Sequence, residues 1–147
     1  MTITKSSRRT AMDQLVEIAQ QVRNSSYFVK RGAVNWASFP FDKVGRALSI
    51  SIDTQSLLEE SFDNATVSLE MFGRIEEVSG DIVEVGIDDA FMDQIIDDAR
   101  TIIRSWLRST NSDGDCCIFM RGKPQITEAH DTTLMIQGIV VIIEVKF

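Results

Sequence analysis

The stretch DDAFMDQIIDDARTIIRSWLR, from Asp88 to Arg108, decides the fold class of this 147-residue chain. Its apolar residues recur three and four positions apart and form one wide stripe, as in a helix that lies on a sheet. They are Phe91, Met92, Ile95, Ile96, Ala99, Ile102, Ile103, Trp106 and Leu107. Asp88 or Asp89 can cap the first turn, and arginines follow toward the other end, which suits the helix dipole. We therefore predict a long amphipathic helix here.

Two segments before this helix alternate between apolar and polar residues, which is the period of half-buried strands. They are residues 47–54 and 65–77, and we expect them to pair as antiparallel neighbours. The apolar side of these strands holds Leu48, Ile50, Ile52, Val67, Leu69, Met71 and Ile75. Residues 55–64 between them are too long for a tight turn and predict a protruding hairpin loop. Residues 79–87 alternate briefly and predict a further small edge strand.

Another predicted helix covers residues 10–25, where apolar residues again follow a three- and four-residue spacing. Thr10 and Asp13 resemble a capping box at its start. The next segment, residues 27–46, carries aromatic residues without a helical or alternating period. We predict an ordered loop there that packs across an edge of the core or against a neighbouring subunit.

The end of the chain predicts two more strands, residues 116–121 and 133–147, joined by residues 122–132. The last strand is apolar on both faces in its middle, so it should be central or covered from both sides. Residues 111–115 predict the turn that ends the long helix. Cys116 and Cys117 are adjacent and point to opposite faces of an extended segment, so we interpret them as small hydrophobic residues.

Length and composition indicate one α+β domain, with residues 1–9 as a flexible N-terminal arm. A net charge of -7 argues against sequence-independent nucleic-acid binding, which needs a basic surface. Lys5, Arg8 and Arg9 are the one basic concentration; we interpret them as a solvated tail, with contact to acid or phosphate as the alternative. No secretory or membrane-spanning run is visible, which favours a cytosolic origin and no membrane partner.

Three acidic groupings could carry chemistry. Residues 113–115 resemble part of a calcium loop but lack its other ligands, so we predict a turn. Glu128, His130 and Asp131 combine carboxylates with the single histidine, as a general base or metal ligand would; a surface turn is the preferred interpretation and a small hydrolase or nuclease the alternative. The residues of a third grouping can be interpreted as paired carboxylates, but Asp93 and Asp97, four positions apart, more simply form the solvated face of the long helix. The grouping comprises Asp88, Asp89, Asp93, Asp97 and Asp98.

Other requirements of an enzyme are missing from the sequence. There is no recognisable nucleophile motif, no second histidine and no glycine-rich loop before a helix. We therefore predict no catalytic, metal-binding or cofactor-binding residues and no cofactor.

The order of the predicted elements resembles that of the tail terminator proteins (tail completion, minor tail protein U-like) of long-tailed bacteriophages. The resemblance covers nearly the whole chain and is one of pattern. It is carried by WASFP (residues 36–40), RALSI (46–50), ATVSLEMF (65–72) and the ending GIVVIIEVKF (138–147). It implies a mixed, mostly antiparallel β-sheet packed against two amphipathic helices, with a protruding hairpin.

For function, the resemblance implies a homo-oligomeric ring, expected to be a hexamer, at the head-proximal end of the virion tail. The ring would cap the tail tube protein, stop its polymerisation and join it to the head-side connector or neck protein, after assembly in the host cytoplasm. DNA would only pass through the lumen, where the acidic charge would keep phosphate from sticking. Another head-completion or neck protein is the structural alternative.

A ring with head-to-tail contacts needs two different surfaces on one subunit. The aromatic segment and the hairpin loop are the candidates, because buried aromatic residues dominate interface energy. Alternatively, the loop folds back on the sheet. The candidate interface residues are Trp36, Phe39, Phe41, Leu57, Leu58 and Phe62.

Overall fold

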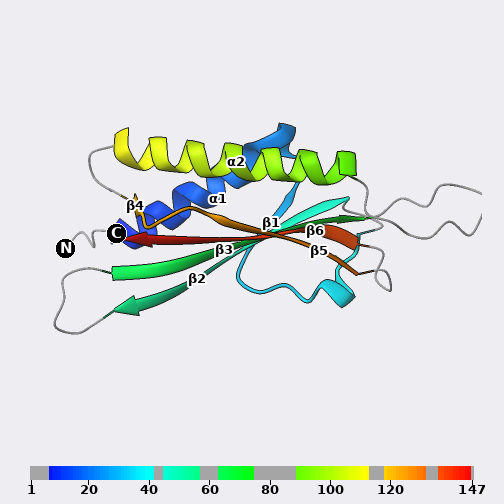
Figure 1. Ribbon diagram of the computed structural model, residues 1–147, viewed down its shortest axis with the longest axis horizontal. Helices are drawn as coiled ribbons and strands as arrows, with labels where there is room; N and C mark the ends of the chain where they lie inside the picture. Colours follow the sequence, from blue (N-terminus) through cyan, green and yellow to red (C-terminus); the bar gives the residue numbers. More distant parts are fainter. Residues whose placement is uncertain are drawn as a thin grey trace, which may run out of the picture.

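The computed structural model describes residues 7–41, 45–56, 63–74, 89–112, 118–131 and 136–146. In this part of the chain, two helices lie on one face of a six-stranded sheet (Figure 1). The strand order is β1-β2-β3-β6-β4, with β5 also paired to β6. Every pairing is antiparallel except that of β1 with β2. The predicted α+β class, with a mixed and mostly antiparallel sheet against two helices, is confirmed.

The elements of the described residues have the following bounds. The helices are α1 (Ser7–Ser25) and α2 (Asp89–Ser112), and η1 (Trp36–Ser38) is a short 3-10 helix. The strands are β1 (Phe28–Arg31), β2 (Arg46–Ser56), β3 (Asp63–Arg74), β4 (Phe119–Met120), β5 (Gln125–Asp131) and β6 (Ile136–Lys146).

The predicted antiparallel pairing of the two alternating strands is confirmed as the β2–β3 hairpin. Its register sets Leu48 opposite Met71 and Ile50 opposite Leu69, so the apolar sides of both strands share the face under the helices. The strands pair as far as Ser56 and Asp63, so they take up both ends of the predicted loop. Residues 57–62, with the candidates Leu57, Leu58 and Phe62, lie outside the described residues, as do residues 75–88 and the edge strand predicted among them.

Strand β6 is central, as predicted from its apolar character on both faces. It pairs with β3 on one side and with β4 and β5 on the other. Ile139, Val141 and Ile143 face the helices and are almost fully buried, whereas Ile142 on the opposite face is 37% exposed. In β6, the helix face is therefore fully covered, whereas the opposite face is covered incompletely.

Two predictions of irregular structure were wrong. Residues 122–132 were predicted as a connection but contain β5, and residues 27–46 were predicted as a loop but contain β1. Both strands are edge strands, and most of their side chains are exposed. Their pairing with β2 and β6 uses backbone groups, so it needs no alternating apolar pattern in the sequence.

The helix ends also differ from the predictions. α1 begins at Ser7 instead of Thr10, so residues 7–9 belong to the helix and not to an arm. α2 continues to Ser112, beyond the predicted start of the turn at Asn111, while residues 113–117 lie outside the described residues together with Cys116 and Cys117.

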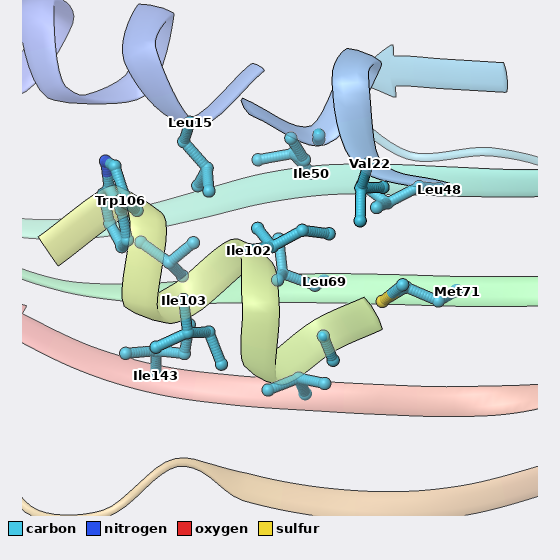
Figure 2. Close-up of a cluster of buried hydrophobic side chains, with 14 of the residues drawn as sticks. Leu15, Val22, Leu48, Ile50, Leu69, Met71, Ile102, Ile103, Trp106 and Ile143 are labelled. Carbon is cyan, nitrogen blue, oxygen red and sulfur yellow. The ribbon is translucent and has the colours of Figure 1, made fainter. Parts of the chain in front are cut away.

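The main core lies between the helices and the sheet (Figure 2). Trp106 of α2 is fully buried, and its indole Nε1 donates a hydrogen bond to the backbone carbonyl of Ala11, 2.8 Å away. This bond joins α2 to α1 and satisfies the one polar atom that the large side chain brings into the core. Leu15 of α1 and Ile102 of α2 contribute to the same cluster above Leu69 of β3.

Gly138 allows β6 to approach β3 closely. It lies opposite Phe72, and a Cβ atom at this position would collide with the backbone carbonyl of Met71.

Candidate functional site

The segment between β1 and β2 folds against the sheet face opposite the helices (Figure 1). Its turn is local: the Asn35 side chain accepts a hydrogen bond from the backbone N–H of Ala37, and the N–H of Phe39 donates to the carbonyl of Trp36. An asparagine that caps the first turn in this way is a common start for a short helix. The turn directs Trp36 toward the sheet, where its Nε1 lies 3.3 Å from Glu70 Oε2.

Five aromatic side chains meet here, and we call them the aromatic cluster. They are Phe28, Trp36, Phe39, Phe41 and Phe72. The ring centroids of Trp36 and Phe72 are 4.9 Å apart, and those of Phe39 and Phe41 are 4.6 Å apart. Phe28 joins through Phe39 at 5.6 Å. These separations and tilted planes lie in the range that aromatic pairs prefer.

The aromatic cluster consists of buried side chains that support it and of more exposed side chains at its surface. Phe41 and Phe72 are 8% and 7% exposed, so they hold the segment on the sheet. Trp36 and Phe39 are half-buried, and Phe28 is 46% exposed. Of the predicted interface residues, Trp36 and Phe39 thus keep accessible area, whereas Phe41 is placed underneath them. Phe28 was not among the predicted candidates.

Phe28 lies at an edge of the sheet. Its strand, β1, ends the strand order and, within the described ranges, pairs with β2 alone. An exposed phenylalanine on a strand edge, continuous with a half-buried tryptophan, can be covered by another chain without rearrangement of the fold. This arrangement suits protein contact rather than chemistry.

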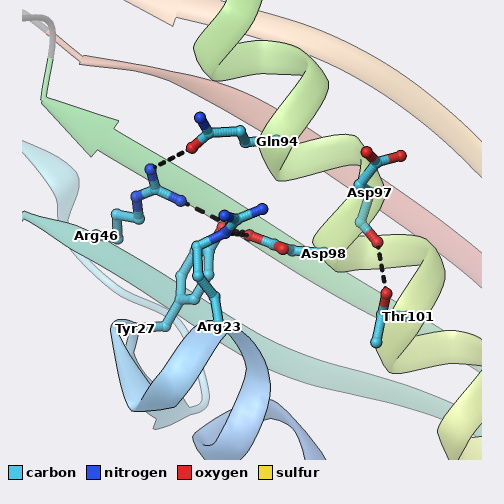
Figure 3. A network of polar contacts seen from close by, with 7 residues as sticks. All are labelled: Arg23, Tyr27, Arg46, Gln94, Asp97, Asp98 and Thr101. Carbon is cyan, nitrogen blue, oxygen red and sulfur yellow. Dashed lines mark hydrogen bonds and ion pairs between the residues drawn. The ribbon is translucent and has the colours of Figure 1, made fainter.

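A second cluster of functional groups surrounds Asp98, a buried residue of α2 (Figure 3). Asp98 Oδ2 accepts hydrogen bonds from Arg23 Nε and from the Tyr27 hydroxyl, each 2.7 Å long, and Arg46 Nη1 lies 3.7 Å away. The Asp98 side chain is 7% exposed. Arg46 Nη2 also donates to Gln94 Oε1 at 2.8 Å. We call the set of Arg23, Tyr27, Arg46 and Asp98 the Asp98 network.

Two members of the Asp98 network, Arg23 and Tyr27, have raised pKa values. The hydrogen bond to Asp98 raises the pKa of Arg23, and the negative charge nearby adds to this effect. Burial raises the pKa of Tyr27 above its ordinary value, and the hydrogen bond to Asp98 raises it further. At neutral pH the phenol is therefore a neutral donor to a carboxylate that cations surround.

The Asp98 network fastens the end of α1. Arg23, Asn24 and Ser25 have φ values of 48°, 53° and 61°, a left-handed conformation that is unfavourable for residues with a side chain. Arg23 is the first of these residues and Tyr27 follows two positions after the last. Their hydrogen bonds to Asp98 stabilise this conformation and offset the strain. Asp93 and Asp97 lie on the solvated face of α2, as predicted, whereas Asp98 of the same acidic grouping is buried.

The predicted grouping around the single histidine lies along the edge strand β5. Glu128, His130 and Asp131 all lie on β5 and are exposed to solvent, so the preferred prediction of a surface turn was wrong in its structure. His130 and Asp131 are neighbours in an extended strand and therefore point to opposite faces of the sheet. In the described ranges, no group of three metal-ligating side chains is close enough to hold an ion.

The fold defines this chain as a two-layer α+β protein, and two comparisons with known proteins add no family to that description. The sequence matches no protein-family model. A search among curated proteins found no similar protein either. As for membranes, none of the helices in the described ranges has the length and apolar character to cross one.

Proposed function

We propose that this chain is a structural assembly protein of the tail-terminator type. In this proposal its subunits form a ring, expected to be a hexamer, that caps the tail tube, stops its polymerisation and joins it to the head-side connector. The aromatic cluster carries the proposal, because it offers the half-buried Trp36 and Phe39 together with the exposed Phe28 of an edge strand.

The aromatic cluster has the properties of an interface anchor. Large aromatic side chains supply most of the energy in many interfaces because they bury a large area at a small entropic cost. Phe41 and Phe72 already hold Trp36 and Phe39 in place, so little order has to be gained when a partner covers them. A neighbouring subunit is the partner that we propose.

The fold agrees with the ring that the resemblance implies. Two helices cover one face of a mixed sheet, and β2 and β3 form a hairpin. A ring needs a second, different surface on each subunit, and the hairpin loop of residues 55–64 remains the predicted one. The net charge of -7 supports a lumen that repels DNA, so that DNA passes without sticking.

The proposal is tested by adding the purified protein to growing tubes of the cognate tail tube protein. We expect ring-shaped particles at tube ends in electron micrographs and tubes that stop growing. Phe28→Ser should weaken ring formation and capping, because it removes an exposed aromatic side chain from the ring contact.

The matched control is Phe119→Ser, since Phe119 of β4 is 63% exposed but does not belong to the aromatic cluster. It should form rings and cap tubes like the unaltered protein. Absence of rings and of any effect on tubes would contradict the proposal. Binding to the head instead of the tube would assign the chain to the alternative class of head-completion or neck proteins.

A further inference from the structure

The outer face of α2 carries six charged residues in one line, which we call the charge stripe. They are Asp89, Asp93, Asp97, Arg100, Arg104 and Arg108, and all six are exposed. Their spacings of three and four positions keep them on one side of the helix, away from the buried stripe. At about 1.5 Å per residue, the charge stripe runs along roughly 28 Å of α2.

The charge stripe is divided by sign and is symmetric about its centre. Its aspartates occupy the first half and its arginines the second. Asp97 and Arg100 are equally far from the midpoint between residues 98 and 99, and so are Asp93 and Arg104. Asp89 and Arg108 complete the same pattern. Each aspartate therefore has an arginine at the mirror position.

The helix dipole alone does not account for this pattern. Its effect on charged side chains fades beyond the first and last turns, whereas Asp97 and Arg100 lie in the middle of α2. These two residues form an ion pair at 3.6 Å within the helix, yet their side chains are 72% and 59% exposed. They remain accessible to charges on another molecule.

We infer that the charge stripe docks α2 against α2 of a second copy of this chain, in antiparallel orientation. A two-fold axis through the midpoint of the stripe would set every aspartate opposite an arginine of the partner. A parallel arrangement would instead set like charges together, so the pattern also selects the orientation. The contact is isologous, because the same surface is used on both copies.

This contact is separate from the ring contact in the proposed function. α2, which carries the charge stripe, lies on one side of the sheet, and the segment between β1 and β2, which carries Trp36 and Phe39, lies on the other (Figure 1). A two-fold contact cannot close a ring by itself, because a ring requires head-to-tail surfaces. The pairing of α2 can therefore hold while the ring proposal fails, and the reverse.

The α2 contact should be weak and sensitive to salt. Exposed ion pairs gain little energy individually, and dissolved ions screen them. We expect the dimer dissociation constant, measured by sedimentation velocity, to rise about tenfold or more between about 0.05 M and about 0.5 M salt. The Phe28→Ser protein is a suitable background for this measurement, because any ring through the aromatic cluster is weakened in it.

Charge reversal tests the orientation. Asp93→Arg alone sets two arginines opposite each other at both ends of the contact, and Arg104→Asp alone does the same with aspartates, so each variant should lose the dimer. The double variant Asp93→Arg/Arg104→Asp restores opposite charges and should dimerise again. An equal mixture of the two single variants should also form a mixed dimer, because each supplies the charge that the other lacks.

The control is Arg121→Asp, which changes the net charge as Arg104→Asp does, but at an exposed residue outside α2. It should leave the dimer intact. Circular dichroism checks that each variant keeps its helices. A monomer at every salt concentration would overturn the inference, and so would single reversals without effect or a double variant that stays monomeric.

Discussion

The two faces of the sheet differ in how completely their side chains are buried. On the helix face, Leu69, Val141 and their neighbours are fully buried under α1 and α2. On the opposite face, the aromatic cluster covers one part, while Ser68 is half-buried and Ile142 is 37% exposed. The difference indicates that stability is concentrated on the helix face and that contacts with other molecules are to be sought on the outer surfaces.

Leu69→Ala should have the largest effect on stability. Leu69 is fully buried in the main core, and its truncation should lower the free energy of unfolding by about 3 kcal/mol through lost burial and a cavity. Ile142→Ala on the opposite face should lower it by less than about 1 kcal/mol, because that side chain is already partly in water. Urea unfolding of both variants measures the difference; equal losses would show that the two faces do not differ as described.

Asp98→Ala should have the next largest effect and lower the free energy of unfolding by about 2 kcal/mol. It removes a buried acceptor and leaves the Tyr27 hydroxyl and Arg46 without their carboxylate partner. The expected loss of stability is no larger because the Arg23 side chain is 37% exposed, so water can hydrate it when Asp98 is absent. Asp97→Ala is the matched control: it changes the charge equally at an exposed position and should cost less than about 0.5 kcal/mol. Similar losses in the two variants would exclude a stabilising role for the Asp98 network.

Trp36→Leu should lower the free energy of unfolding by about 1 kcal/mol, because the tilted contacts to Phe39 and Phe72 are lost while an apolar side chain remains. Phe28→Ser should change it by less than about 0.5 kcal/mol, since Phe28 is half in solvent. Thermal unfolding of both proteins provides the comparison. A large loss for Phe28→Ser would mean that its effect on rings reflects folding instead of contact.

The smallest expected effect on stability comes from the ionisation of Tyr27 and should appear only at alkaline pH. Burial raises the pKa of Tyr27 in the folded protein, so the unfolded chain releases the phenol proton first as the pH rises. The contribution of Tyr27 is complete below about pH 10, its ordinary pKa, and is lost as the pH rises above that value toward the folded pKa. The chain has one tyrosine, so tyrosinate absorbance reports this group alone. Ionisation at the ordinary pKa in the folded protein would contradict the burial, and Tyr27→Phe should lose stability less steeply in this range.

The strongly patterned elements could be predicted from the sequence. α2 and the β2–β3 hairpin follow from the periods of their apolar residues, because those periods match the faces that are buried. The central position of β6 follows from its apolar residues on both faces. The edge strands β1 and β5 could not be predicted in this way. They have few buried side chains, and their formation depends on backbone pairing with β2 and β6.

The aromatic cluster and the Asp98 network are harder to predict from the sequence, because each is formed by residues that lie far apart in the chain. Trp36 and Phe39 were predicted as a packing surface from composition alone, but Phe28 was missed because its position beside Phe39 follows from the path of the chain. Asp98 lies only about 100° around the helix from the exposed Asp97. Its partners Arg23 and Tyr27 are 75 and 71 positions away in the sequence, so no local signal marks it as buried.

The most direct test of the proposed ring is the solution mass of the purified chain, measured by light scattering over a range of protein concentrations. We predict a mass that rises to that of a closed ring in the unaltered protein and in Phe119→Ser, and that stays lower in Phe28→Ser. A mass that is the same for all three proteins at every concentration would contradict the assignment of the aromatic cluster as a subunit contact.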